Sequence, residues 1–202
     1  MSLKDLQNLE GRVALVTGGS RGLGLQMAEV LGELGATVVI TARKKHELED
    51  AAATLTKQSV KVETVVNDLQ DSGSVQPLVE GILERHGQID VVINNAGAAW
   101  GEKAEDHSLE AWEKVINLNL TAPFLLSQMV GKLSMIPRRS GRIINIASIY
   151  GLVGPDPRVY EGSEYLGGPI NTPAVYSASK AAVVGFTKWL STYLGSRNIR
   201  AN

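Results

Sequence analysis

The stretch RVALVTGGSRGLGLQMAEVLGELG, residues 12–35, decides how the rest of this sequence is interpreted. Its first seven residues (12–18) are mostly apolar and β-branched, which is typical of a buried strand. Residues 23–35 have the apolar periodicity of an amphipathic helix, which ends at Gly35. A glycine-rich turn joins the two. The order strand, turn, helix is the first half of a unit in which a helix connects two parallel strands.

The same alternation continues along the chain. It predicts further strands at residues 37–42, 60–67, 90–97 and 141–148, and helices at residues 46–58, 74–87, 108–135 and from 174 onward. Alternation at this spacing predicts right-handed crossovers on a parallel sheet. We therefore expect one domain over residues 1–202, an α/β fold with a three-layer, doubly wound, Rossmann-like parallel sheet. A sixth strand begins in NIRAN (198–202), so we expect this fold to be incomplete at its C-terminal end.

The composition argues against several classes of function. The 202 residues carry a formal net charge of -1 and scattered positive residues, so no nucleic-acid partner is expected. There is no cysteine, which removes disulfides and thiolate chemistry and fits a reducing compartment. The N-terminus lacks the apolar core of a signal peptide, and no apolar run approaches the roughly 20 residues that cross a bilayer. We expect a cytoplasmic protein without membrane contact and, because the histidines are not clustered, without a metal.

The glycine-rich turn reads TGGSRGLG over residues 17–24. Glycines at 18, 22 and 24 let the backbone turn sharply and approach a pyrophosphate, and the next helix offers free N–H groups and a partial positive charge. The spacing T-G-x-x-x-G-x-G differs from the commoner G-x-G-x-x-G. Many βα turns are rich in glycine, but the place after the first strand favours dinucleotide binding. The expected contacts are Gly18, Ser20, Arg21, Gly22, Leu23 and Gly24.

The choice of cofactor depends on the end of the second strand. A carboxylate there would accept hydrogen bonds from the adenosine ribose and repel a 2′-phosphate. This sequence has Ala42 and then Arg43, while Arg21 lies in the glycine-rich turn. Two guanidiniums without an opposing carboxylate suit a phosphate group. We expect NADP(H) to be preferred and NAD(H) to be possible; alternatively, both arginines are only solvated surface charges.

Two further strand ends carry candidate cofactor contacts. Asp68 and Leu69 follow the third strand, where Asp68 can accept from the adenine amino group or cap the next turn. The motif NNAG ends the fourth strand and brings Asn95, Ala96 and Gly97 to the carboxyl edge of the sheet, where ligands bind in such folds. The asparagine amides can equally hold neighbouring strands together.

The stretch AVYSASKAAVVGF, residues 174–186, sets Tyr176 four residues before Lys180 with only small residues between them. Small residues fill a core poorly, so burial alone does not explain the pattern. Residues four apart lie on one face of a helix. The phenol and the ammonium are therefore expected side by side.

With these features the chain resembles the short-chain dehydrogenase/reductase family. The resemblance covers nearly all 202 residues and rests on TGGSRGLG, NNAG, the serine of NIAS and YSASK, in the expected order. It implies hydride transfer between a nicotinamide and a carbonyl or alcohol. Within the family, the chain is similar to NADP-dependent 3-oxoacyl reductases and to sugar and polyol dehydrogenases.

The resemblance also implies catalytic roles for four residues. Tyr176 would be the acid/base, Lys180 its cationic neighbour and a contact of the nicotinamide ribose, and Ser148 the donor that positions the carbonyl. Bringing a tyrosine pKa from about 10 to about 7 takes roughly 4 kcal/mol. An ammonium about 4 Å away supplies about that much at an effective dielectric of about 20. Asn119 of NLNL would hold a water linking Lys180 to solvent, or else brace a helix as a buried amide.

Residues 151–174 are rich in glycine and proline and separate Ser148 from Tyr176 by more than is common in the family. Loops this long inside a compact domain are usually functional or mobile. The segment can lie over the substrate, or it can be a surface excursion. In the first case a sugar or polyol would suit its hydroxyl and carboxylate side chains, which are Tyr160, Glu161, Glu164 and Tyr165.

Family members are usually tetramers built through helices like those of residues 108–135 and 175–195, so a homo-dimer or homo-tetramer is expected. The alternative function is a dinucleotide-binding regulator or scaffold without catalysis, since the later family elements are missing from this sequence. The presence of Ser148, Tyr176 and Lys180 together argues against that alternative, because a sensor needs only the glycine-rich turn.

Overall fold

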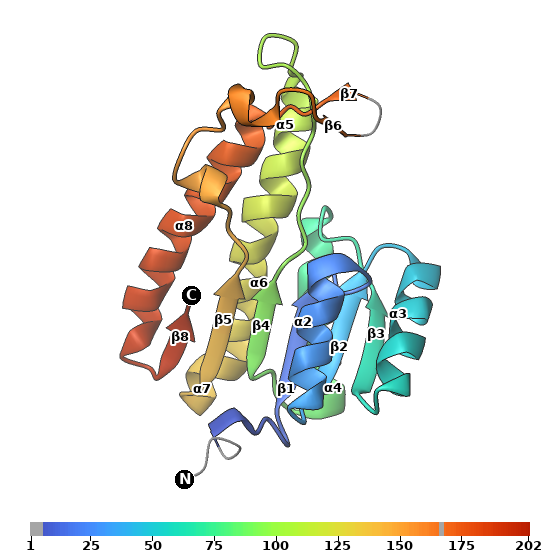
Figure 1. Ribbon diagram of the computed structural model, residues 1–202. Coiled ribbons are helices and arrows are strands. Elements are labelled where there is room, and N and C mark those ends of the chain that lie inside the picture. The colour runs from blue at the N-terminus through green and yellow to red at the C-terminus, as the bar shows by residue number, and fades with distance from the viewer. Residues whose placement is uncertain (1–5, 166–167) are drawn as a thin grey trace.

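The computed structural model describes residues 6–165 and 168–202 (Figure 1). A six-stranded sheet has the order β3-β2-β1-β4-β5-β8, and a hairpin pairs β6 with β7. The strands are β1 (Val13–Thr17), β2 (Thr37–Ala42), β3 (Lys61–Val66), β4 (Val91–Asn94), β5 (Gly141–Asn145), β6 (Glu164–Tyr165), β7 (Gly168–Pro169) and β8 (Ile199–Ala201). The helices are α2 (Gly22–Glu33), α3 (Lys45–Lys57), α4 (Val75–His86), α5 (Leu109–Ile116), α6 (Ala122–Val130), α7 (Ile136–Arg138) and α8 (Ala174–Gly195).

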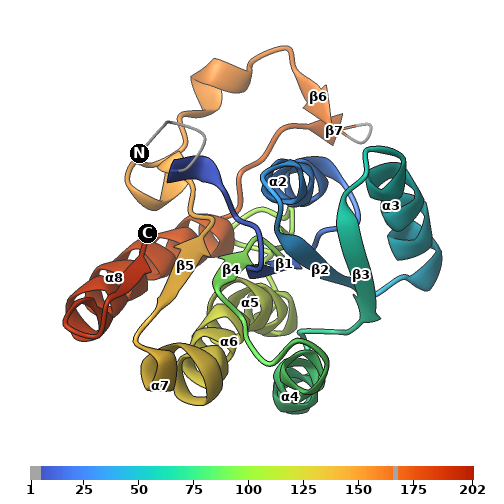
Figure 2. The same cartoon turned by 90° about the horizontal axis from the view of Figure 1, so that it is seen from below.

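All neighbouring strands of the large sheet are parallel, which confirms the predicted α/β class. Helices α2 and α3 lie on one face of the sheet, and α4 to α8 lie on the other (Figure 2). All five residues of β1 are buried because both faces of this strand are covered. Val13 and Leu15 belong to the core under α4, α6 and α8, while Ala14 and Val16 belong to the core under α2 and α3. The uninterrupted apolar run of β1 thus serves two cores.

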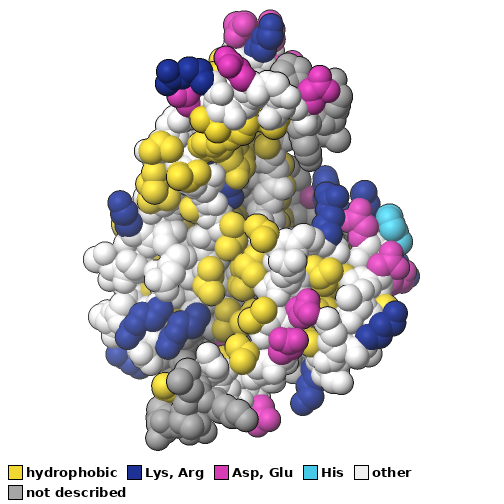
Figure 3. All heavy atoms as spheres, viewed as in Figure 1, with side chains coloured by type: hydrophobic (Ala, Val, Ile, Leu, Met, Phe, Trp, Pro, Cys, Tyr) yellow, Lys and Arg dark blue, Asp and Glu magenta, His cyan; other side chains and the backbone are white. Residues whose placement is uncertain are grey.

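Strand β5 is covered on one face only. Gly141, Ile143 and Asn145 are buried, whereas Arg142 is exposed and Ile144 is half-buried. The alternation arises because α2 lies over the β1 and β2 side of the sheet and leaves β5 open beside it (Figure 1), whereas all four residues of β4 are buried. Apolar side chains are visible at the surface of this face (Figure 3).

The strand order reverses next to β1. The chain runs outward from β1 through β2 to β3 and then returns to the other side of β1 as β4. The loops after β1 and β4 therefore diverge and open a crevice at the carboxyl ends of the strands, where ligands bind in doubly wound sheets. Strands β4 and β5 end at Asn94 and Asn145, earlier than the predicted 97 and 148, because the backbone leaves the sheet there; residues 95–97 then line the crevice.

Local sequence accounts for several helix ends. Gly87 adopts φ +72° and stops α4, and Gly35 with φ +100° follows α2. The Ser108 side chain accepts a hydrogen bond from the N–H of Ala111 at 3.2 Å and so caps α5. Helices α5, α6 and α7 form one continuous run joined by two π-helical turns, Asn117–Thr121 and Gly131–Met135.

Residues 151–173 are largely irregular, as predicted. They contain a short 3₁₀ turn, Pro157–Tyr160, and the β6–β7 hairpin. Figure 1 shows the segment at the end of the molecule toward which the sheet strands point. Within the described part of the chain, no helix combines the length and apolar character that crossing a membrane requires.

Candidate active site

The glycine-rich turn after β1 packs tightly against the loop after β4. Gly18 and Gly22 have φ values of +64° and +55°, which L side chains rarely adopt. A Cβ at Gly24 would overlap the carbonyl of Gly18 and the side chain of Asn95. Helix α2 begins at Gly22 without a side-chain cap and without an acidic residue in its first turn, so its first N–H groups are free to bind an anion. The turn fits a dinucleotide pyrophosphate, because the bare backbone leaves room for it.

A groove of about 500 Å³ lies at the carboxyl ends of the strands. Its walls include all the cofactor contacts predicted from the strand ends and the glycine-rich turn, namely Gly18, Ser20, Arg21, Gly22, Leu23, Gly24, Arg43, Asp68, Leu69, Asn95, Ala96 and Gly97. Ala42, expected at the end of β2, also lines the groove, and the sequence pattern does not single out the remaining lining residues, which are Thr41, Lys44, Glu47, Asn67 and Leu118. Tyr176 and Lys180, also predicted as cofactor contacts, are not part of this lining.

One end of the groove carries both predicted arginines and an unpredicted carboxylate. Glu47 accepts hydrogen bonds from Lys44 Nζ at 2.8 Å and from Ser20 Oγ at 3.4 Å. The hydrogen bond from Lys44 lowers the pKa of the Glu47 carboxyl, and the charges of Lys44 and Arg21 act in the same direction. The end of β2 carries no carboxylate, as expected, but Glu47 lines the groove together with Arg21 and Arg43. The acceptor comes from the first turn of α3 instead of the end of β2.

The loops after β3 and β4 make their own hydrogen bonds at the groove. Asp68 Oδ1 accepts from the N–H of Gln70 at 3.0 Å, so its side chain caps the turn after β3. Asn94 Nδ2 donates to Asn145 Oδ1 at 2.7 Å and ties β4 to β5. Asn95 Nδ2 donates to the carbonyl of Thr17 at 2.9 Å and ties the loop after β4 to β1. The two amides hold the strands together, which was one of the two expectations for them.

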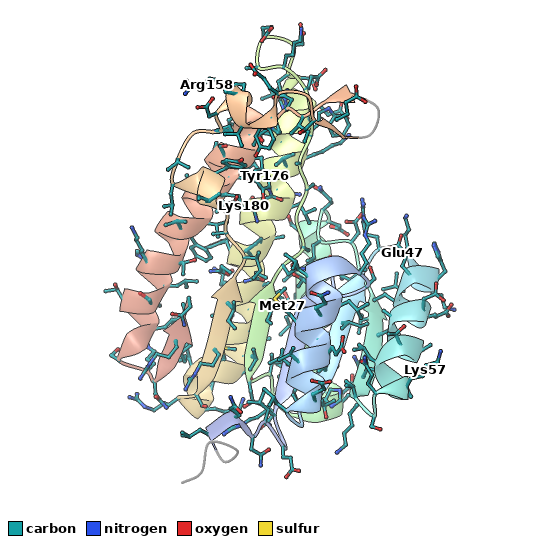
Figure 4. The ribbon with its side chains drawn as sticks, in the orientation of Figure 1. Met27, Glu47, Lys57, Arg158, Tyr176 and Lys180 are labelled. Carbon is teal, nitrogen blue, oxygen red and sulfur yellow. The ribbon has the colours of Figure 1, made fainter. Side chains whose placement is uncertain are left out.

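Tyr176 and Lys180 lie one turn apart near the start of α8, and Figure 4 shows them as neighbours. Lys180 Nζ lies 5.7 Å from the centre of the Tyr176 ring and donates a hydrogen bond to the carbonyl of Ile146 at 2.6 Å. The predicted pair is therefore formed, but the ammonium is anchored by the loop after β5. Only 6% of Lys180 is exposed, and this burial lowers the pKa of its ammonium.

Ser148 lies in the same loop, three residues beyond the end of β5. Its Oγ accepts from the N–H of Tyr150 at 3.2 Å and starts a 3₁₀ turn, Ile149–Gly151. A Cβ at Gly151 would overlap the backbone of Lys180 and Ala181. The turn that carries Ser148 is thus pressed against the part of α8 that carries Lys180.

Asn119 lies in the first π-helical turn and is 2% exposed. Its Oδ1 accepts from the N–H of Ala98 at 2.8 Å, and its Nδ2 donates to the carbonyl of Ala98 at 2.9 Å and to Ser179 Oγ at 3.0 Å. These bonds are those of a brace between the loop after β4 and α8. A π-helical turn is often found at a functional site.

Gly97 lies between the groove and the predicted catalytic residues Asn119 and Lys180. It lines the groove, and a Cβ on it would lie 3.2 Å from Asn119 Oδ1 and 3.8 Å from Lys180 Nζ. The part of the groove that Gly97 lines therefore adjoins the Lys180 ammonium. Among residues 6–165 and 168–202, no group of three or more His, Cys, Asp or Glu side chains is arranged to hold a metal ion.

Comparison with known proteins gives a consistent result. Residues 12–202 match the sequence model of the family described as short chain dehydrogenase. A gluconate 5-dehydrogenase from Gluconobacter oxydans is 35% identical over 100% of this chain and 73% of its own length. A 3-oxoacyl-[acyl-carrier-protein] reductase from Synechocystis is 36% identical over 96% of this chain and 72% of its own length.

Solved structures match as well. A metagenomic short-chain oxidoreductase in complex with NADP superposes with a TM-score of 0.82 at 33% identity, over 95% of this chain and 80% of its own. An NAD+-bound xylitol dehydrogenase superposes with a TM-score of 0.82 at 31% identity, over 96% of this chain and 68% of its own.

Proposed function

Since the chain belongs to the short-chain dehydrogenase family, we propose that it is an NADP(H)-dependent oxidoreductase that transfers a hydride between a nicotinamide and a carbonyl or secondary alcohol. The observation that carries the proposal is the position of Gly97, which borders both the groove and the Lys180 ammonium. A dinucleotide that fills the groove toward Gly97 would bring its reactive end to Tyr176 and Lys180. We also propose that residues 1–202 act as one dinucleotide-binding and catalytic unit.

The residues at the arginine end support NADP(H) as the preferred cofactor, with NAD(H) accepted as well. Arg21 and Arg43 can bind a 2′-phosphate, and the bare backbone of the glycine-rich turn can take the pyrophosphate. Relatives of known structure have been solved with NADP and with NAD+. Asp68 is proposed to accept from the adenine amino group with the carboxylate oxygen that its turn leaves free.

When bound, the cofactor supplies or accepts the hydride. The Tyr176 hydroxyl gives a proton to the carbonyl oxygen that becomes the alcohol, and takes it back in the reverse direction. The Lys180 ammonium lies beside the Tyr176 ring, and its bond to Ile146 fixes its position. Ser148 donates to the same carbonyl oxygen as negative charge develops there. Asn119 positions the loop of Gly97 through its bonds to Ala98.

Two substrate classes are proposed, and each follows from a relative. The gluconate 5-dehydrogenase suggests sugar acids and the xylitol dehydrogenase suggests polyols, while the 3-oxoacyl reductase suggests acyl thioesters. The segment after Ser148 offers polar groups for the first class, because Glu161 and Glu164 are exposed and Tyr160 is half-buried. The side chain of Tyr165 lies outside the described part of the structure. Asn171 ties the segment to the loop after β4 by donating to the carbonyl of Glu102 at 2.8 Å.

We further propose a homo-oligomer of two or four chains in the cytoplasm. Helices α6 and α8 form an apolar groove of about 280 Å³. Phe124, Trp189 and Tyr193 border it and are 43%, 57% and 49% exposed, and a second copy would bury them. The cysteine-free composition suits the cytoplasm. A regulator or scaffold without catalysis is not favoured, because the relatives are named as dehydrogenases and reductases.

The test is Tyr176→Phe, which removes one oxygen and leaves the ring. We expect unchanged NADPH affinity by fluorescence titration and a loss of turnover of at least about 100-fold, the lower bound for a positioned acid/base. Turnover is measured with a panel of candidate substrates, which contains sugar-acid ketones, polyol-derived ketones and 3-oxoacyl thioesters. Tyr193→Phe is the matched control on the same helix: it lies outside the dinucleotide groove and keeps the ring that the proposed interface buries, so it should retain full turnover. Undiminished turnover of Tyr176→Phe would contradict the assignment.

A further inference from the structure

Glu47 and Asp68 are the two carboxylates that line the groove in the described structure, and of the two it is Glu47 that bonds to Lys44 and Ser20. It reaches from the first turn of α3 to Ser20 in the glycine-rich turn and so bridges two loops that both border the groove. Its side chain is 25% exposed, while that of Glu49, in the same helix, is 60% exposed and pairs with Lys45 away from the groove. Figure 4 shows Glu47 at the end of α3 toward which the sheet strands point.

We propose that Glu47 sets the balance between NADP(H) and NAD(H) by supplying the carboxylate that the end of β2 lacks. The inference rests on the proposed function, because it concerns the binding of the same cofactor. Strand β2 ends at Ala42 and is followed by Arg43, so no strand-end carboxylate is present to accept from a ribose hydroxyl. Glu47 lines the same groove as both residues and offers such an acceptor.

The same carboxylate opposes a 2′-phosphate in two ways. A phosphate monoester brings a charge of about -1.5 to -2 near neutral pH, which the Glu47 charge repels. Glu47 also occupies Lys44 Nζ and Ser20 Oγ, two donors that a phosphate would otherwise use. The hydrogen bond from Lys44 lowers the pKa of Glu47, so the negative charge persists throughout the neutral range. Arg21 and Arg43 therefore favour NADP(H), and Glu47 reduces that preference.

The experiment measures dissociation constants of NADPH and NADH for the wild type and for Glu47→Gln, which keeps the shape and removes the charge. Removal of one negative charge beside the 2′-phosphate in near-aqueous surroundings should lower the dissociation constant of NADPH about fivefold. The dissociation constant of NADH should rise about twofold, because an amide oxygen is a weaker acceptor for the ribose hydroxyl than the carboxylate it replaces. The ratio of the NADH constant to the NADPH constant therefore rises about tenfold in low salt and less in high salt. Arg43→Ala should move the ratio the other way.

Two controls make the result specific. Glu49→Gln removes a carboxylate two residues away on the same helix and should leave the ratio within about twofold, because a solvated charge farther from the groove is screened. Adenosine 2′,5′-bisphosphate and adenosine 5′-diphosphate, titrated calorimetrically, should reproduce the shift without a nicotinamide. An unchanged or lowered ratio in Glu47→Gln, with both dinucleotides still bound by a folded protein, would overturn this inference alone. A wild type that binds neither dinucleotide would overturn the proposed function and this inference together.

Discussion

Replacement of Asn119 by alanine tests how much of the site's architecture depends on one buried amide. The side chain makes three hydrogen bonds, two with the backbone of Ala98 and one with Ser179, at 2.8 to 3.0 Å. Each is worth about 1 kcal/mol net, and an unpaired N–H or carbonyl left behind costs about 1–3 kcal/mol where water cannot reach it. Ala98 is only half-buried, so part of that penalty is recovered by hydration. We expect Asn119→Ala to lower the free energy of unfolding by about 2 to 3 kcal/mol.

The assay is urea denaturation followed by far-UV circular dichroism, with Asn117→Ala as the matched control. Asn117 lies in the same π-helical turn, so both substitutions change helix propensity equally. Its Nδ2 donates to the carbonyl of Gln70 at 2.7 Å at a partly exposed position, and its loss should cost about 1 kcal/mol. The two variants should therefore differ by at least about 1 kcal/mol in unfolding free energy.

The Asn119→Ala variant should also weaken NADPH binding, because the loop it releases includes Gly97, which lines the groove. Asn117→Ala should weaken NADPH binding less, because the turn of its partner Gln70 is also held by the Asp68 side chain. Equal losses of unfolding free energy in both variants would refute the reasoning, because the amide of Asn119 would then contribute no more than a surface amide.

Three further predictions concern the turn, the ammonium and the serine. Gly24→Ala should lower NADPH affinity at least about tenfold, since its Cβ overlaps the turn's own backbone. In Gly22→Ala the Cβ meets no atom within 4 Å, so the substitution should lower only the free energy of unfolding, by the left-handed strain of about 1 to 2 kcal/mol. Equal NADPH affinities of the two variants in titration would contradict this. The pKa of Lys180 is lowered in the folded protein, so the unfolded chain binds more protons between the folded and the unfolded pKa, and stability should rise with pH there relative to Lys180→Met. Denaturation at pH 8 and pH 10.5 measures this, and a difference that stays constant would contradict the burial of the ammonium. Gly151→Ala should reduce turnover more than it lowers NADPH affinity, because its Cβ displaces the turn of Ser148 from α8; stopped-flow kinetics separates the two effects, and a loss of affinity as large as the loss of turnover would contradict this.

Much of the site could be predicted from local sequence. The glycine spacing of residues 17–24 specifies a turn that only bare backbone can form, and positive φ at Gly18 and Gly22 bears this out. Spacings within one helix, such as that of Tyr176 and Lys180, are also local, because helical geometry alone brings residues four apart together. Strand–helix alternation was enough to predict which loops meet at the carboxyl edge of the sheet.

What the sequence by itself determined is therefore the parallel α/β fold, the phosphate-binding turn and the Tyr176–Lys180 pair. The tertiary structure alone decided that Glu47 faces Ser20, that Lys180 donates to Ile146, and that Asn119 braces Ala98. These contacts join residues more than 20 positions apart on different elements. Their geometry depends on strand order, helix packing and side-chain rotamers, and no periodicity within one segment encodes those.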